Sequence, residues 1–206
     1  MKIYIKKSSE ASDDIKSNPF YDSRFWGRAL DFNDIFLPNS DEVLSFALAA
    51  HEIGHLSKVD QDDTANTRLD NFNATKNEEQ RAWRVGKKYL MKHINQYYQD
   101  EMTLNDISER IDRVDYIMMK IVDWSKCVYL ENGSFNVLNE SQRMQIITRQ
   151  RETLYKEKEA DWKKFVQQLT SQEIGRQINW EKFVTIVKLS LLNIIKDNQY
   201  LQKGGL

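Results

Sequence analysis

Residues 39–58 read NSDEVLSFALAAHEIGHLSK, and this stretch decides the fold. Asn39 or Ser40 is placed to cap a helix, and the carboxylates of Asp41 and Glu42 then suit the positive end of its dipole. At about 100° per residue, the apolar side chains that follow surround the helix almost completely. We therefore expect a buried central helix that runs to the end of this stretch.

Two of the three histidines lie on this helix, in the run His51-Glu52-Ile53-Gly54-His55. Four residues make about one turn, so both imidazoles project from one side with the spacing that a tetrahedral metal ion needs. Glu52 lies about 100° further round the helix, where its carboxylate can reach a water on the metal without binding the metal itself. The pattern is typical of metal-dependent hydrolysis. Two buried, hydrogen-bonded histidines, or a metal site without catalysis, are the alternative interpretation.

The residues before the helix favour β-strands. Lys2–Lys6 alternates polar and apolar side chains with a period of two, as a half-buried strand does. Phe20–Phe36 is rich in aromatic and large apolar residues and is interrupted by Gly27, Asp31 and Asn33, which favours one or two further short strands. We predict a small N-terminal sheet from these two segments.

The chain after the helix is mainly helical by pattern. The polar stretch Val59–Asn77 has no sustained period and predicts a loop. Asn132-Gly133, between two apolar-rich flanks, indicates either a β-hairpin or a plain helix–helix loop. Helical patterns occupy four stretches: about Glu78–Tyr98, Thr103–Trp124, Glu140–Leu169 and Trp180–Leu201.

These patterns predict an α+β fold that is mostly α. The small N-terminal sheet should pack on the histidine helix and the helix that follows it, and a helical C-terminal region should complete the core. A chain of 206 residues has the size of one domain. We expect residues 1–100 to form the core that carries the site and residues 101–206 to pack on it within the same domain.

Composition limits the partners and the compartment. Thirty Lys and Arg residues against 31 Asp and Glu residues leave a net charge of -1, so the positive field that nucleic-acid binding uses is missing, and we expect no nucleic-acid partner. Cys127 is the only cysteine, which excludes an intrachain disulfide. The opening residues lack the apolar segment of a signal peptide, and no apolar run is long enough to span a membrane. We therefore expect a cytoplasmic protein with no membrane partner.

The His-Glu-x-x-His run resembles the zincin metallopeptidases, in which both histidines bind zinc and the glutamate is the general base. The metzincin subclass has Gly and His where this sequence has Lys58 and Gln61, so the third ligand of metzincins is missing and this subclass is excluded. Glu79-Gln80-Arg81-Ala82, on the predicted second helix, is similar to the Glu-x-x-Ala third-ligand motif of gluzincins. Through His-Glu-Ile-Gly-His-Leu and the later Tyr-Leu-Met, the ImmA/IrrE-like peptidases look closest. Trp83 departs from those groups, which place Asn or Asp after the alanine, so an acidic residue at position 60, 62 or 63 should orient a histidine instead.

Two adjacent glutamates compete for the place of third ligand. At about 100° per residue, Glu79 lies at the centre of the apolar and small-residue face of its helix, whereas Glu78 lies at the boundary with the basic, solvent-exposed face of Arg81, Lys88 and Lys92. Ala82 and Gly86 beside Glu79, facing Gly54, would let the two helix backbones approach closely. We therefore expect Glu79 to be the ligand.

The resemblance implies a zinc-dependent peptidase. Zn²⁺ would be held by His51, His55 and Glu79, with Glu52 as the general base. An edge strand within Ala29–Leu37 could hold an extended peptide by main-chain pairing. We expect a protein or peptide substrate, a restricted regulatory role, and a regulatory partner bound through the helical C-terminal region. The competing hypothesis is a catalytically silent, zinc-stabilised adaptor.

Overall fold

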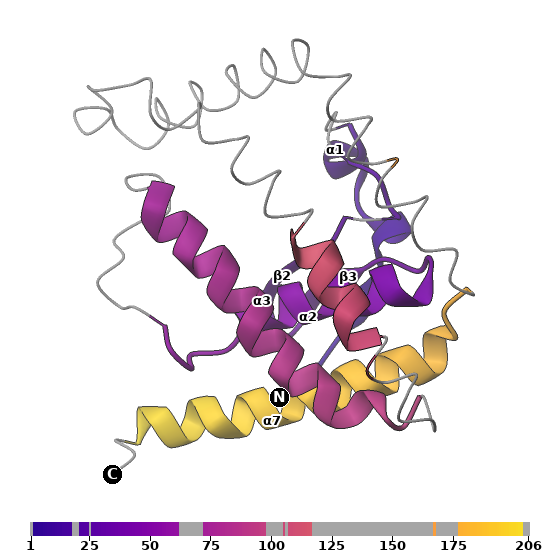
Figure 1. Ribbon diagram of the computed structural model, residues 1–206. Helices are drawn as coiled ribbons and strands as arrows, with labels where there is room; N and C mark the ends of the chain where they lie inside the picture. The colour runs from indigo at the N-terminus through magenta and orange to yellow at the C-terminus, as the bar shows by residue number, and fades with distance from the viewer. Residues whose placement is uncertain are drawn as a thin grey trace, which may run out of the picture.

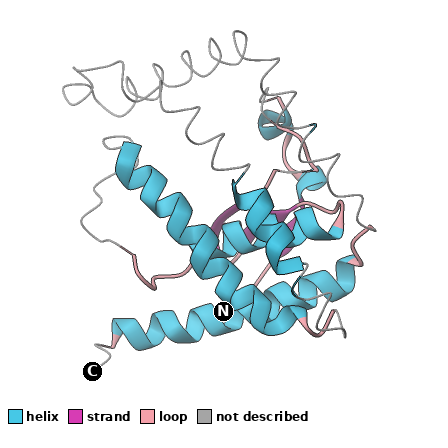
Figure 2. Cartoon of the chain, in the orientation of Figure 1, coloured by secondary structure: helices cyan, strands magenta, loops and turns pink. Residues whose placement is uncertain are grey.

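The computed structural model describes residues 2–17, 21–24, 26–61, 72–97, 105, 107–116, 167 and 177–203. Within these residues the chain is mainly helical, with one small sheet near the N-terminus (Figure 2). The α+β class, mostly α, is therefore confirmed. The elements in chain order are β1 (Ile5–Lys7), the 3-10 helix η1 (Ser8–Glu10), α1 (Asp13–Lys16), β2 (Arg28–Asp31), β3 (Asp34–Leu37), α2 (Glu42–His55), α3 (Phe72–Ile94), a helix at 107–116, and α7 (Trp180–Gln202).

The three strands form one sheet in the order β1-β3-β2. β1 runs parallel to β3, with Ile5 opposite Ile35, and β2 pairs with β3 as an antiparallel hairpin, with Ala29 opposite Ile35. β3 occupies the centre, and its Ile35 and Leu37 are fully buried against the helices. The predicted small sheet is confirmed, and β2 is one of its two edge strands.

The start and end of α2 differ from the sequence prediction. The cap is Asp41, whose carboxylate accepts a hydrogen bond from the Leu44 amide at 2.9 Å, so the choice of Asn39 or Ser40 was wrong. The Ser40 hydroxyl lies 3.0 Å from the Arg24 carbonyl and donates to it instead. The helix ends at His55, whereas the sequence predicted that it would run to about Lys58.

α2 is the buried central helix that its apolar side chains predict. It packs against the sheet, α3 and α7 (Figure 1). Phe46 and Ile53 are fully buried, and the Phe46 ring meets the Phe183 ring of α7 with centroids 5.3 Å apart. A helix buried on nearly every side can hold its two histidines and its glutamate in fixed places.

The crossing of α2 and α3 depends on small residues. A Cβ atom at Gly54 would lie 1.9 Å from the carbonyl oxygen of Ala82, and one at Gly86 would lie 1.7 Å from that of Ala50. Real Cβ atoms do not come so close, so the two backbones touch where only glycine fits. The close approach predicted for Gly54, Ala82 and Gly86 is confirmed, and it brings the side chains of both helices to one place.

α3 begins earlier than the sequence pattern predicts. Phe72–Asn77 belongs to the helix, so the predicted loop was wrong over this stretch. The segment is polar, but it contains neither Pro nor Gly, and polar residues without a breaker cost a helix little. α3 therefore begins at Phe72, six residues before the predicted start at Glu78. 

α7 confirms the predicted C-terminal helix and packs on α2 and α3. Asn179 caps it by accepting from the Lys182 amide at 3.1 Å. The Tyr89 hydroxyl of α3 donates to Asp197 at 2.5 Å, and Asn198 donates to the Leu56 carbonyl at 2.8 Å. The helix at 107–116 agrees with the pattern from position 103, whereas the Asn132-Gly133 turn and the helix predicted over 140–169 lie outside the described residues.

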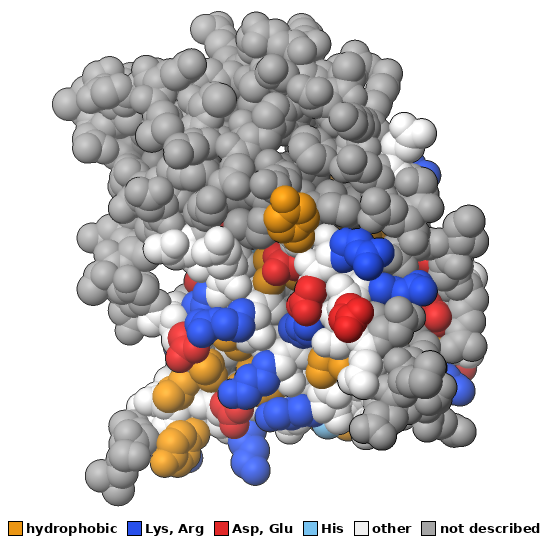
Figure 3. Space-filling model, in the orientation of Figure 1, with side chains coloured by type: hydrophobic (Ala, Val, Ile, Leu, Met, Phe, Trp, Pro, Cys, Tyr) orange, Lys and Arg blue, Asp and Glu red, His pale blue; other side chains and the backbone are white. Residues whose placement is uncertain are grey.

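The described surface carries both signs of charge. Figure 3 shows acidic and basic side chains interspersed on one face, without a large area of a single sign. Within the described residues, no helix combines the length and apolar character needed to cross a membrane. 

Candidate metal centre

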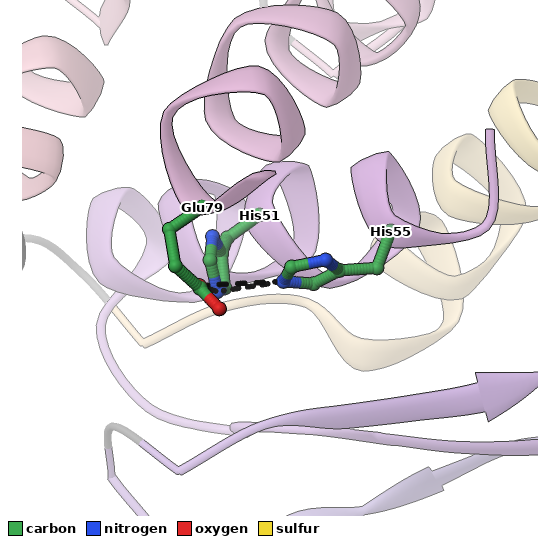
Figure 4. A group of neighbouring side chains, drawn as sticks. All are labelled: His51, His55 and Glu79. Carbon is green, nitrogen blue, oxygen red and sulfur yellow. Dashed lines mark hydrogen bonds and ion pairs between the residues drawn. The ribbon is translucent and has the colours of Figure 1, made fainter. Parts of the chain in front are cut away.

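Three side chains from α2 and α3 converge on one point (Figure 4). His51 Nε2 lies 3.1 Å from Glu79 Oε2, and His55 Nε2 lies 3.4 Å from the same oxygen. The two Nε2 atoms are 3.2 Å apart. The structure thus brings together the three residues that the sequence proposed as ligands, and it does so with one atom from each.

The triangle of ligand atoms matches the size of a tetrahedral site. With metal–ligand distances of about 2.0–2.1 Å, two ligands of a tetrahedral zinc ion lie about 3.3 Å apart. The three observed separations are 3.1, 3.2 and 3.4 Å. Two imidazole nitrogens and one carboxylate oxygen therefore form a possible binding site for a divalent metal ion, with a donor set that suits zinc.

Charge interactions within the cluster oppose the effect of burial. Burial favours a neutral Glu79, but hydrogen bonds with His51 and His55 hold the pKa of Glu79 well below its usual value. Burial lowers the pKa of His55, yet hydrogen bonds with Glu78 and Glu79 outweigh it and raise the pKa to about 9. Without a metal, the His55 ring is therefore protonated on both nitrogens and positively charged near neutral pH. A metal ion that binds Nε2 would have to displace the proton on that nitrogen.

Glu78 has a role that the sequence did not reveal. Its Oε1 lies 3.2 Å from Nδ1 of His55, on the side of the ring opposite the cluster. A carboxylate at this nitrogen fixes the tautomer and keeps Nε2 directed at the metal position. The sequence analysis predicted that an acidic residue at position 60, 62 or 63 would orient a histidine. Asp60 instead accepts from Arg84 at 3.1 Å, so its assignment was wrong, and positions 62 and 63 lie outside the described residues.

Arg81 holds Glu78 in place. Its Nε and one terminal nitrogen each donate to Glu78 at 2.6 Å, and this pair outweighs burial and lowers the pKa of Glu78 to about 2. The guanidinium also donates to the carbonyl of Gly54 in the last turn of α2 and to those of Ser57 and Val59, which follow the helix. Helical spacing placed Arg81 on the exposed basic face, but its side chain is buried. The i, i+3 spacing of Glu78 and Arg81 was the available signal for this pair.

His51 is supported differently from His55. Its ring lies against the Trp83 ring, with centroids 4.6 Å apart and planes tilted by 34°. Its Nδ1 is buried and has no hydrogen-bond partner among the described residues. Trp83 therefore supplies a packing surface for the imidazole where the resembled peptidases place a polar residue.

Glu52 lies beside the cluster rather than in it. A Cβ at Gly27 would come within 2.8 Å of the Glu52 Cγ, so the side chain passes directly over the chain before β2. Burial raises the pKa of Glu52, while the nearby histidines and a hydrogen bond from the Ala29 amide act against this rise. A carboxylate with a raised pKa beside a metal position suits a general base.

The third histidine is not part of the site. His93 Nε2 accepts from the Asn193 side-chain amide at 2.8 Å, which joins α3 to α7. This position fits a structural residue and makes His93 a matched control for the two cluster histidines.

Comparisons with known proteins found no matching family model, no similar curated protein and no similar solved structure. The chemistry of the site must therefore be argued from its own residues.

We expect the purified protein to bind about one zinc ion per chain, as a single three-ligand site does. His51→Ala and His55→Ala should abolish tight binding, whereas His93→Ala should retain it. Because the site joins two helices, removing the metal with a chelator should lower the melting temperature. Metal analysis after gel filtration and thermal unfolding measure both effects. A metal-free protein whose stability ignores added zinc would contradict the assignment.

Glu79→Gln and Glu78→Gln should weaken zinc binding to different degrees. Glu78→Gln removes a charged partner of His55, a change that typically costs about 10–100-fold in metal affinity. This effect is larger than sequence alone suggested, because only the structure shows the contact with His55. Glu79→Gln removes a ligand atom and should cost more. A competitive zinc titration ranks the two variants, and the reverse order would make Glu78 the ligand.

Proposed function

We propose that this protein is a zinc-dependent metallopeptidase that acts on a protein or peptide substrate. The convergence of His51 Nε2, His55 Nε2 and Glu79 Oε2, with Glu52 beside them, carries this proposal. A bound zinc ion would supply Lewis acidity, polarising the scissile carbonyl and lowering the pKa of a water molecule. 

Glu52 is the general base in this proposal. It removes a proton from the attacking water and then donates it to the leaving amine. Its place directly after His51 and outside the ligand triangle leaves its carboxylate free of the metal. Burial raises its pKa, and a more basic carboxylate accepts a proton from water more readily.

The edge strand β2 supports a peptide substrate. The Ala29 amide of β2 donates to the Glu52 carboxylate, so the strand and the proposed base lie together. Within the described sheet, β2 pairs only with β3, and an extended substrate can add to an edge strand by main-chain hydrogen bonds. A peptide held there would present its carbonyl near the cluster.

The direct test is to find cleavage that depends on both the metal and Glu52. We would incubate the purified protein with a cell lysate and map new protein N-termini by mass spectrometry. Matched samples would contain the wild type, the wild type with a chelator, and Glu52→Gln. A lysate contains many candidate substrates, whereas a casein assay contains only one. A protease that cleaves a single protein can therefore be detected in the lysate even if it does not cleave casein.

We expect new N-termini only with the metal-loaded wild type. Identical N-termini in all samples, from a protein that still binds one zinc per chain, would overturn the enzymatic role and favour the zinc-stabilised adaptor.

A further inference from the structure

Two buried polar atoms, one in the cluster and one on a helix that contacts α3, lack hydrogen-bond partners among the described residues. They are Nδ1 of His51, on α2, and Oδ1 of Asp115, on the helix at 107–116. One is a nitrogen that can donate and the other is an oxygen that can accept. Buried groups of this kind are normally paired, so each requires an explanation.

Trp83 connects the two residues in space. The Trp83 ring contacts the His51 ring on one side, and Trp83 and Asp115 line the same cavity of about 320 Å³. Lys87 fixes the helix that carries Asp115 against α3, because its ammonium donates to the Ser108 carbonyl at 3.1 Å. Asp115 therefore shares a cavity with the ring that packs on His51.

Electrostatic interactions also link Asp115 to His51. Burial raises the pKa of Asp115 to about 6, and a charge on His51 is the strongest interaction that opposes this rise. Asp112 raises the pKa further and Lys87 lowers it. Lys87 already donates to Asp112 at 2.5 Å, whereas Oδ1 of Asp115 has no donor among the described residues.

Metal binding through Nε2 leaves the Nδ1–H of His51 as the group that needs a hydrogen-bond acceptor. A histidine that binds a metal through Nε2 carries its proton on Nδ1, and that N–H usually donates to a carboxylate or carbonyl. For His55, this acceptor is Glu78. For His51, the candidate acceptor is Asp115 Oδ1, the one buried side-chain oxygen in the described part of the chain that has no hydrogen-bond partner.

We propose that Asp115 is the positioning residue of His51, accepting the hydrogen bond from Nδ1–H when Nε2 binds the metal. This inference rests on the proposed metal site. It assigns one carboxylate to each histidine, from different helices: Glu78 of α3 for His55, and Asp115 of the 107–116 helix for His51. The 107–116 helix thus becomes part of the metal site, although it contributes no ligand.

The test compares Asp115→Ala, Asp115→Asn and Glu109→Ala in the full chain. Glu109 is a matched control, because it is an exposed carboxylate on the same helix. Competitive zinc titration should show a loss of about 10–100-fold for Asp115→Ala, as expected for a residue that hydrogen-bonds a metal ligand. Asp115→Asn should recover part of the loss, since its amide oxygen still accepts, and Glu109→Ala should bind like the wild type.

A second readout follows the hydrogen bond itself. In the zinc-loaded wild type, the His51 Nδ1 proton should give a slowly exchanging downfield NMR signal, assigned by ¹⁵N labelling of histidine and by its through-space coupling to the adjacent Trp83 ring. Asp115→Asn should shift this signal upfield, and Asp115→Ala should lose it through exchange with water. A merely structural role for Asp115 would change the melting temperature without moving this proton.

The outcomes separate this inference from the proposed function. If the wild type binds no zinc, both fail. A second outcome is that the wild type binds zinc tightly and both Asp115 variants show the same zinc affinity and the same His51 Nδ1 proton signal as the wild type. In that case the metal site stands and the role of Asp115 is overturned. Asp115→Asn preserves size and shape, so it decides the question if Asp115→Ala fails to fold.

Discussion

Glu52→Gln should bind zinc and fold like the wild type, yet hydrolyse its substrate about 10²–10⁴-fold more slowly, the contribution typical of a general base. The amide keeps the shape of the side chain and can still accept the hydrogen bond from Ala29. It cannot accept a proton from water. The variant should therefore separate binding from chemistry, and rate measurements on a cleaved substrate, with zinc analysis of the same samples, test this.

A second expected result for Glu52→Gln concerns the free energy of unfolding. Because burial raises the pKa of Glu52, its ionised form is less stable in the folded chain than in the unfolded chain near neutral pH. Removing that charge should leave the metal-free protein at least as stable as the wild type. Glu109→Gln, an exposed change on the 107–116 helix, is the control and should alter neither rate nor stability. An active Glu52→Gln enzyme would exclude Glu52 as the base.

The cluster of His51, His55 and Glu79 could be predicted because local periodicity determines it. His51 and His55 share one face of α2 whatever the rest of the chain does, since four residues make about one turn. The choice of Glu79 over Glu78 followed from the apolar and small residues that share its face of α3. Gly54 and Gly86 then indicated how closely the two helices approach, and the structure confirms that contact.

The surroundings of the cluster could not be predicted in the same way. Glu78 and Arg81 lie where an exposed basic face begins, and only the position of the end of α2 makes Arg81 a buried donor to three carbonyls. Asp115, the proposed partner of His51, lies on a third helix whose packing against α3 no spacing along the sequence encodes. The side chains around the cluster are thus set by tertiary contacts, whereas the cluster itself follows helical repeats.

The contact between α2 and α3 leads to the largest expected effect on stability. Alanine in place of a helical glycine normally stabilises an exposed helix by about 1 kcal/mol. At Gly86 the added Cβ would lie 1.7 Å from the Ala50 carbonyl oxygen, and at Gly54 it would lie 1.9 Å from that of Ala82. Both obstacles are backbone atoms within helices, so neither can move without separating α2 from α3.

Gly86→Ala and Gly54→Ala should therefore each destabilise the protein by about 3 kcal/mol or more, the upper range for overpacking a core. Urea unfolding of the metal-free proteins measures this, with Lys88→Ala, an exposed change on α3, as the control. Any folded fraction should also bind zinc weakly, because Glu79 reaches the histidines only while the helices touch. Since propensity and packing predict opposite signs, a gain in stability for either variant would show that the helices do not meet at these glycines.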